Sequence, residues 1–109
     1  MTEDVLQQLA ALIQERRGDS AANSYTRELL DAGPERCAKK LGEEATETII
    51  AALGHDARAL TGEAADLLYH LLVLLEAKRV PLSDVLAELK SRMGTSGLAE
   101  KAARQAKSK

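Results

Sequence analysis

An almost unbroken apolar run at positions 67–75 constrains this sequence most. The run reads Leu67-Leu68-Tyr69-His70-Leu71-Leu72-Val73-Leu74-Leu75 and lies inside a segment whose spacing predicts a helix from about Ala57 to Arg79. A helix that is apolar on nearly all sides must be buried on all sides. A 109-residue chain has too few helices to cover it, since small domains bury only ~60% of their unfolded surface. We therefore expect a homodimer that shares this helix across a two-fold axis, with higher assembly left open.

The composition predicts an all-α fold of four to five helices in a single domain, residues 1–109. Hydrophobic residues make up 45% of the chain, but aromatic residues only 2%. A core of Leu, Ala, Ile and Val is typical of helices, whereas strands favour β-branched and aromatic residues in runs, which this chain lacks. All-β and dinucleotide-binding α/β folds are therefore excluded.

Capping residues and apolar spacing divide the chain into helices. The first helix is expected to begin after an N-cap at Thr2 and to run to about Arg17. Ser24 is predicted to cap a short helix through Thr26 to Asp31. The remaining predictions are a helix over 34–53 that opens at Pro34, the apolar helix from about 57 to 79, a helix capped by Ser83 that ends before Gly94, and a frayed basic tail over about 105–109.

Charge and cysteine content exclude several functional classes. The net charge is -2 and the sequence pI is about 5.7, so nothing indicates binding to nucleic acid or to an anionic membrane. The single cysteine, Cys37, can form neither an intramolecular disulfide nor a cysteine-based zinc cage, and we interpret it as a small core residue. With no apolar run long enough to span a membrane and no basic N-terminal signal, a soluble protein of the reducing cytoplasm is expected.

Acidic residues on two consecutive predicted helices give the strongest functional signal. Glu43, Glu44 and Glu47 project from one side of their helix, with Glu47 about 40° from Glu43 and about 60° from Glu44. Glu63 and Asp66 are also about 60° apart on the next helix. The connection around Gly54 is short, so the helices are antiparallel neighbours and the two acidic groups can face each other.

The orientation of the acidic residues decides between a metal site and a solvated surface. Glu63 and Asp66 lie in line with Leu67, His70 and Leu74 of the apolar stripe, so we expect them to point inward. Inward-pointing carboxylates repel one another unless a cation compensates them, and oxygen ligands without a cysteine cluster select Mg²⁺ or Mn²⁺. The alternative is that the Glu-rich helix simply faces water.

Two roles are possible for several other residues. Lys40 either forms an i,i+4 ion pair on its own helix, with Glu44, or binds a phosphate of a metal-bound substrate. His70 is either a partner of a metal-binding carboxylate, which we favour, or a core histidine. We expect Tyr69 to pack at the subunit interface. In the tail, Ser96-Gly97 opens a predicted helix that carries Lys101 and Arg104 on one face, which suits a phosphate, although a basic tail more often serves solubility.

These motifs resemble those of a known family. Glu43-Glu44-x-x-Glu47 followed by Glu63-x-x-Asp66 resembles the signature of the all-α nucleoside-triphosphate pyrophosphatases, the MazG-like superfamily. Four segments are similar to the phosphoribosyl-ATP pyrophosphatase family of histidine biosynthesis: Ser24-Tyr25-Thr26 with Leu29-Leu30, the stretch 39–47, the stretch 63–75, and Arg92-x-Gly94-x-Ser96-Gly97-Leu98-x-Glu100-Lys101-x-x-Arg104. The resemblance covers about Val5 to Arg104 and implies a MazG-like helical bundle completed by homodimerisation.

The resemblance implies a reaction and roles for the residues. The reaction is the Mg²⁺-dependent hydrolysis of 1-(5-phosphoribosyl)-ATP to 1-(5-phosphoribosyl)-AMP and pyrophosphate, by an enzyme not fused to the cyclohydrolase of the next step. The metal ligands would be Glu44, Glu47, Glu63 and Asp66, and the catalytic carboxylates Glu43, Glu44 and Glu47, although the helical wheel does not decide which of them is the base. The substrate-binding residues would be Lys40, Ser96, Gly97, Lys101 and Arg104.

Two alternative functions are kept. The first is a house-cleaning pyrophosphatase of the same superfamily that acts on free or damaged nucleoside triphosphates; it would share the acidic site but has no need of the Ser-Gly-Leu-x-Glu-Lys tail. The second is a non-enzymatic helical dimerisation module, which predicts that divalent ions leave the stability of the protein unchanged.

Overall fold

The protein is all-α, as predicted. A computed structural model describes residues 4–18, 24–93 and 104–105. Its helices are α1 (Val5–Arg16), α2 (Tyr25–Ala32), α3 (Pro34–Leu53), α4 (Ala57–Ala77) and α5 (Leu82–Arg92). No strand occurs in these ranges. None of the helices in the described part of the chain is both long and apolar enough to cross a membrane.

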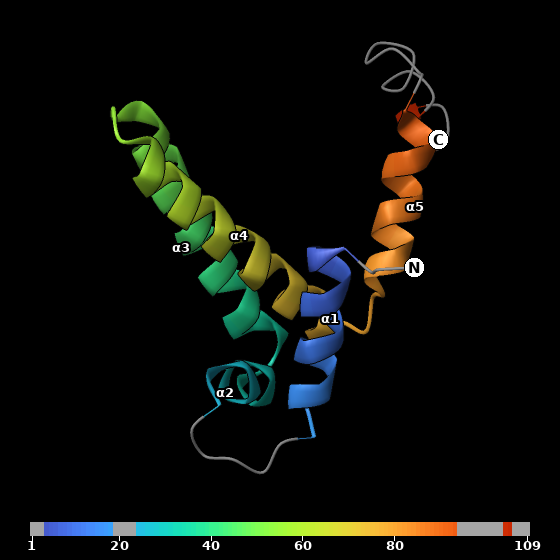
Figure 1. Cartoon of the computed structure of the whole chain (residues 1–109). Coiled ribbons are helices and arrows are strands. Elements are labelled where there is room, and N and C mark those ends of the chain that lie inside the picture. The colour runs from blue at the N-terminus through green and yellow to red at the C-terminus, as the bar shows by residue number, and fades with distance from the viewer. Residues whose placement is uncertain (1–3, 19–23, 94–103, 106–109) are drawn as a thin grey trace.

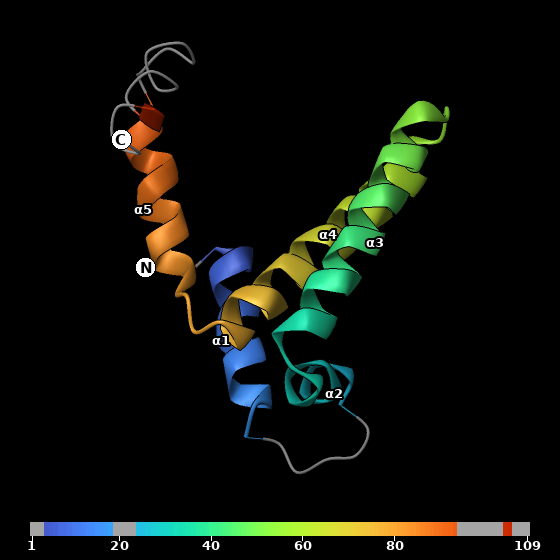
Figure 2. The same cartoon turned by 180° about the vertical axis from the view of Figure 1, so that it is seen from behind.

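The two longest helices, α3 and α4, form an antiparallel hairpin that extends from the body of the protein (Figure 1). The helices α1 and α2 pack against the end of this hairpin where α3 begins and α4 ends. Beyond that point, α5 diverges from the hairpin on the other side of the molecule, as the reverse view also shows (Figure 2). The antiparallel arrangement of α3 and α4 places their predicted acidic segments side by side.

The predicted starts of α2 and α3 are confirmed. Ser24 caps α2 by accepting a hydrogen bond from the backbone N–H of Arg27 at 3.1 Å. Gly33, with φ of 100°, ends α2 in a conformation that favours glycine, and Pro34 then occupies the first turn of α3, where its missing N–H costs nothing.

The predicted caps of α1 and α5 are wrong. The N-cap of α1 is Asp4, not Thr2, because Asp4 and Gln7 form a reciprocal pair of side-chain to backbone hydrogen bonds at 2.8 and 3.2 Å. The helix α5 begins at Leu82, two residues earlier than a Ser83 cap requires. Pro81 is its N-cap, with no side-chain hydrogen bond, and its extended ψ of 140° turns the chain directly into the helix.

The core lies where α1, α2, the start of α3 and the end of α4 meet. It consists of the buried side chains of Ile13, Leu29, Leu30, Cys37, Leu72 and Val73. Cys37 is 1% exposed and its thiol donates to the carbonyl of Leu29 at 3.3 Å, which confirms its interpretation as a core residue. Burial raises the pKa of this thiol, so it stays protonated.

Large apolar side chains remain exposed in the single chain. On α3, Ile49 is 62% exposed and Leu53 is 81% exposed, although the spacing places Ile49 on the apolar face. Leu68, inside the apolar run of α4, is 43% exposed, and Met93 at the end of α5 is 75% exposed. No described residue of α5 is buried. One copy of the chain therefore does not cover the apolar surface of its own long helices.

Candidate active site

Three carboxylates from the α3–α4 hairpin converge on one point. Glu44 comes from α3, and Glu63 and Asp66 come from α4. One oxygen of each residue can be chosen so that all three lie within 4.8 Å of one another. Glu44 and Glu63 are partly buried, whereas Asp66 is exposed. Three carboxylate oxygens at the edge of a helix pair form a donor set that suits a hard divalent cation such as Mg²⁺ or Mn²⁺ and leaves sides open for water and substrate.

Thr48 fixes the two helices at the level of these acids. Its hydroxyl lies 2.8 Å from the carbonyl of Glu44 on its own helix and 3.2 Å from the carbonyl of Glu63 on α4. The hydroxyl has one proton, which it shares between two carbonyl acceptors. The main chains that carry two of the three carboxylates are therefore joined by a direct polar contact across the hairpin.

The electrostatics of the cluster favour a bound cation. Partial burial, followed by the negative charges of Glu44, Glu47 and Asp66, raises the pKa of Glu63 above its ordinary value. A side-chain hydrogen bond with Glu44 acts in the same direction. Carboxylates that repel each other in this way are stabilised in their ionised form when a divalent cation lies between them.

The structure does not bring all the predicted acids to the same point. Glu47 is exposed and lies outside the group formed by Glu44, Glu63 and Asp66. Its charge nevertheless raises the pKa of Glu63, so it belongs to the same electrostatic site. The four predicted metal ligands thus divide into a group of three and one residue at its rim.

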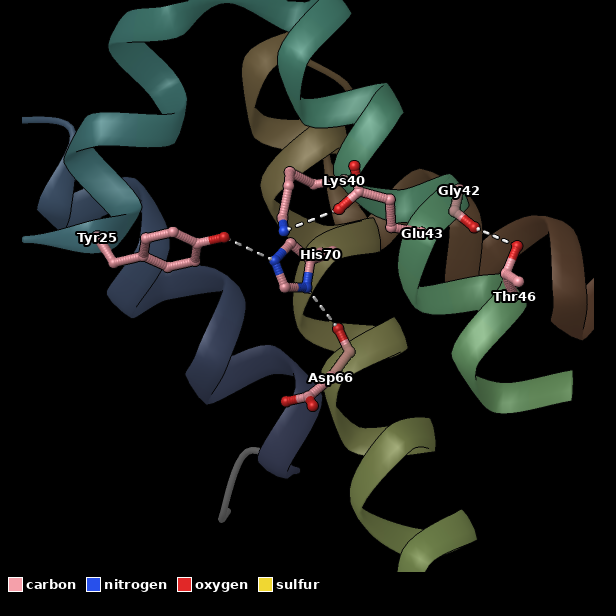
Figure 3. A network of polar contacts seen from close by, with 7 residues as sticks. All are labelled: Tyr25, Lys40, Gly42, Glu43, Thr46, Asp66 and His70. Atoms are coloured by element: carbon pink, nitrogen blue, oxygen red, sulfur yellow. Dashed lines mark hydrogen bonds and ion pairs between the residues drawn. The ribbon is translucent and has the colours of Figure 1, made fainter. Parts of the chain in front are cut away.

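Glu43 pairs with Lys40 one turn before the cluster. The Lys40 ammonium donates to Glu43 Oε1 at 3.1 Å, so the ion pair predicted for Lys40 forms with the residue three positions on (Figure 3). This hydrogen bond and the charge of Lys40 lower the pKa of Glu43. The same hydrogen bond, followed by charge interactions with Tyr25 and Glu43, raises the pKa of Lys40. The ammonium is therefore charged and lies close to the acidic site.

His70 is a core histidine that binds the main chain of its own helix, α4. It is 6% exposed, and its Nδ1 lies 2.8 Å from the carbonyl oxygen of Asp66. The carboxylate of Asp66 points away from the ring (Figure 3). Our favoured interpretation of His70 as a partner of a carboxylate is therefore not supported. The imidazole N–H donates its hydrogen bond to the backbone carbonyl of Asp66, one turn earlier, and not to a carboxylate.

The side chain of Tyr69 contacts residues of its own chain. Its hydroxyl contacts Thr26 Oγ1 at 2.5 Å, and its ring stacks with that of Tyr25. Both contacts hold α2 against α4, whereas the sequence predicted an intersubunit position for Tyr69. Sequence reasoning did not assign roles to Tyr25 and Thr48. The feature of the sequence that could have indicated the role of Thr48 is its position: it is a hydroxyl residue on the apolar face of a predicted helix.

The tail residues predicted to bind phosphate are only partly described. Ser96, Gly97 and Lys101 lie outside the described residues, so the structure does not place them. Arg104 is described and exposed.

A cavity of about 370 Å³ lies at the opposite end of α4 from the acids. It is bordered by α1, the end of α4 and the start of α5, including Gln7, Leu72, Glu76 and Leu82. It shares no residue with the acidic cluster, which is an open edge of the hairpin.

Comparison with known proteins identifies the family of this chain. The family described as phosphoribosyl-ATP pyrophosphohydrolase matches residues 6–93. A protein named phosphoribosyl-ATP pyrophosphatase from Jannaschia sp. (strain CCS1) is 62% identical over 99 residues, which cover 91% of this chain and 97% of the relative. Proteins of the same name from Cereibacter sphaeroides (strain ATCC 17025 / ATH 2.4.3) and Rhodobacter capsulatus are 55% and 56% identical, over 92% and 91% of this chain and 97% and 96% of the relatives. The chain therefore belongs to the phosphoribosyl-ATP pyrophosphohydrolase family.

Proposed function

We propose that this protein hydrolyses 1-(5-phosphoribosyl)-ATP to 1-(5-phosphoribosyl)-AMP and pyrophosphate in histidine biosynthesis. The observation that carries the proposal is the convergence of Glu44, Glu63 and Asp66 in a chain of this family. The names of the relatives support the choice of substrate over other nucleoside triphosphates. The proposal places the reaction in the cytoplasm, in keeping with the single buried thiol.

The cofactor that we propose is Mg²⁺, with Mn²⁺ as a substitute. Glu44, Glu63 and Asp66 would hold it, and Glu47 would complete the ligands from the rim. When bound, the ion supplies positive charge that stabilises the phosphate oxygens as the phosphoanhydride breaks. The pKa of Glu63 is raised first by its partial burial and then by the negative charges of Glu44, Glu47 and Asp66, and a bound cation would offset both effects.

In the proposed reaction, a water oxygen bonds to the α phosphorus. The bond from this phosphorus to the oxygen that bridges the α and β phosphates breaks, so pyrophosphate leaves with the bridging oxygen. Of the carboxylates proposed as catalytic, Glu43 has a lowered pKa and is held by Lys40, which makes it a weak proton acceptor. Glu47 is exposed and lies beside the cluster. We therefore favour Glu47 over Glu43 as the group that orients the water and accepts its proton.

Lys40 is proposed to bind a phosphate of the substrate. Its ammonium has three donors, so it can reach a phosphate oxygen while keeping its contact with Glu43. Ser96, Gly97, Lys101 and Arg104 are proposed to hold further phosphates on the basis of the sequence resemblance alone. A Lys101→Ala variant should then raise the KM with little change in kcat.

We further propose that the protein works as a homodimer. The exposed apolar side chains of α3, α4 and α5 support this, because a second copy would cover them: Ile49, Ile50, Leu53, Leu68, Leu89 and Met93. Burying a fully exposed side chain of this size contributes roughly 1.5 to 3 kcal/mol, and each of these would contribute a part of that in proportion to the surface it still exposes. Equilibrium sedimentation over a range of concentrations would test the assembly.

The decisive experiment is an assay of pyrophosphate release with and without Mg²⁺. The purified protein is given phosphoribosyl-ATP or, in parallel, a panel of ordinary and damaged nucleoside triphosphates. Release from phosphoribosyl-ATP alone, and only with the metal, supports the proposal. Faster turnover of another triphosphate would assign a house-cleaning role, and no turnover of any substrate would leave a dimerisation module.

A further inference from the structure

The two tyrosines of the chain, which has no Phe or Trp, lie together with His70. The rings of Tyr25 and Tyr69 are stacked, with centroids 6.3 Å apart and planes inclined by 20°. His70 meets both rings edge-on, at 6.0 Å from Tyr25 and 5.0 Å from Tyr69. The aromatic surface of the described chain is therefore concentrated at the contact of α2 with α4.

Tyr25 is held firmly yet remains open to solvent. A carbonyl oxygen can only accept, so His70 Nδ1 carries the proton that it donates to Asp66, and the neutral Nε2 accepts from the Tyr25 hydroxyl at 3.3 Å. Tyr69 covers part of one side of the Tyr25 ring. Tyr25 is nevertheless 46% exposed, whereas its neighbours Ser24 and Thr26 are 6% and 9% exposed. The result is an oriented ring with free surface.

This ring borders the acidic site. His70 lies one helical turn after Asp66 on α4, and Lys40 lies one turn before Glu44 on α3. Two hydrogen bonds link the Tyr25 hydroxyl through the His70 ring to the carbonyl oxygen of Asp66 (Figure 3).

We propose that the exposed surface of the Tyr25 ring is the stacking platform for the purine base of the nucleotide substrate. The inference rests on the proposed function for the choice of a nucleotide, and it adds a base-binding residue to a site that otherwise contacts phosphates. A purine stacks on an aromatic ring with offset geometry and needs no hydrogen-bond readout. The hydroxyl bond to His70 fixes the direction of the side chain, and the stacking with Tyr69 restrains the plane of the ring before the base arrives, so binding has less side-chain motion to order.

Three variants separate the ring from the hydroxyl and from the docking of α2. Tyr25→Leu removes the ring, and Tyr25→Phe keeps the ring but removes the hydroxyl. Thr26→Val is the matched control, because it removes the adjacent hydrogen bond between α2 and α4, the one from Thr26 to Tyr69, and leaves the platform in place. Thermal melting by circular dichroism establishes that each variant is folded.

The test measures binding of AMP and of ribose 5-phosphate by calorimetry in the presence of Mg²⁺. The wild type should bind AMP about tenfold or more tightly than ribose 5-phosphate, since stacking on an aromatic side chain supplies this much affinity per base. Tyr25→Leu should reduce the AMP affinity to that of ribose 5-phosphate. Tyr25→Phe should recover most of the loss, and Thr26→Val should bind AMP as the wild type does.

A second measurement keeps the test valid if Tyr25→Leu does not fold. In the wild type, the ring protons of Tyr25, assigned by their disappearance in Tyr25→Phe, should shift on addition of AMP but not of ribose 5-phosphate. Equal binding of the two ligands by the wild type, unchanged AMP affinity in folded Tyr25→Leu, or a change in subunit assembly alone would overturn the proposal. Because neither measurement needs turnover, AMP stacking without hydrolysis of phosphoribosyl-ATP would refute the proposed function and leave this inference standing.

Discussion

The hydroxyl of Thr48 lies 3.2 Å from the carbonyl oxygen of Glu63, so the helix that carries Glu44 is joined by a hydrogen bond to the helix that carries the other two carboxylates. The same hydroxyl lies 2.8 Å from the carbonyl of Glu44. A neutral contact from a side-chain hydroxyl to a main-chain carbonyl therefore supports the packing of the two acidic segments next to the charges.

Replacing Thr48 with Val should destabilise the protein by about 1 kcal/mol, the usual net contribution of one hydrogen bond. It should also weaken Mg²⁺ binding, because the two halves of the site are no longer joined. Chemical denaturation and a Mg²⁺ titration measure the two effects. The matched control is Thr46→Val, since the Thr46 hydroxyl bonds only to Gly42 of its own helix at 3.1 Å. Equal effects of the two variants would contradict the role of Thr48.

Asp66→Asn and Glu44→Gln should abolish Mg²⁺-dependent release of pyrophosphate while the protein stays folded, because each removes a charge and keeps the volume. Glu47→Gln should also abolish turnover, but with a smaller loss of Mg²⁺ affinity, since Glu47 lies outside the group of three. Glu15→Gln, on an exposed position of α1, is the control. Normal turnover by Asp66→Asn would refute the site.

Mg²⁺ should raise the melting temperature of the wild type. A ligand that binds only the folded state at 100 times its dissociation constant stabilises by about 2.7 kcal/mol, and each kcal/mol corresponds to roughly 4 to 8 °C for a domain of about this size. Glu44→Gln should lose most of this shift, whereas Glu15→Gln should keep it. Differential scanning calorimetry is the measurement. A melting temperature that ignores Mg²⁺ would favour the non-enzymatic module.

Without metal, Glu63 should make the protein less stable as the pH rises. Its folded pKa is raised above the ordinary value of 4.5, so between the two values the folded state binds more protons than the unfolded state. The free energy of unfolding therefore falls as the pH increases from about 4.5 through the raised pKa. Glu63→Gln should remove this component. Urea denaturation at several pH values in a metal chelator tests it, and an identical pH profile for both proteins would count against the repulsion.

Arg17 should contribute more to stability than an ordinary surface cation. Its Nε donates to Glu76 Oε2 at 2.7 Å and its Nη2 to the Glu76 carbonyl at 2.7 Å, which ties α1 to the end of α4. Arg17→Met should cost about 1.5 kcal/mol or more. Arg27→Met, which removes an exposed ion pair with Asp31 inside α2, should cost at most about 0.5 kcal/mol. Similar losses measured by urea denaturation would contradict the difference.

Much of the local structure could be predicted because short-range chemistry decides it. The bounds of α3 follow from Pro34 at its start and Gly54 after its end, and the Ser24 cap follows from its side-chain oxygen and the helix after it. Thr2 and Ser83 are equally good capping residues by type, yet Asp4 and Pro81 hold those positions. A cap is chosen by competition between neighbouring residues for the same backbone groups, and residue type alone does not rank the competitors.

The sequence by itself determined the helical class, the hairpin of α3 and α4 and the family, because apolar period, breaker residues and acidic spacing are local properties. Only the tertiary structure decided which carboxylates meet, since Glu47 and Asp66 are equally plausible ligands on a helical wheel but their helices pack at one fixed separation. It also decided that His70 binds a carbonyl and that Tyr25 packs against His70 and Tyr69 while its ring stays partly open to solvent. Side chains at neighbouring positions of a helical wheel differ so little in direction that each can extend to the same point. The packing of whole helices therefore decides their partners.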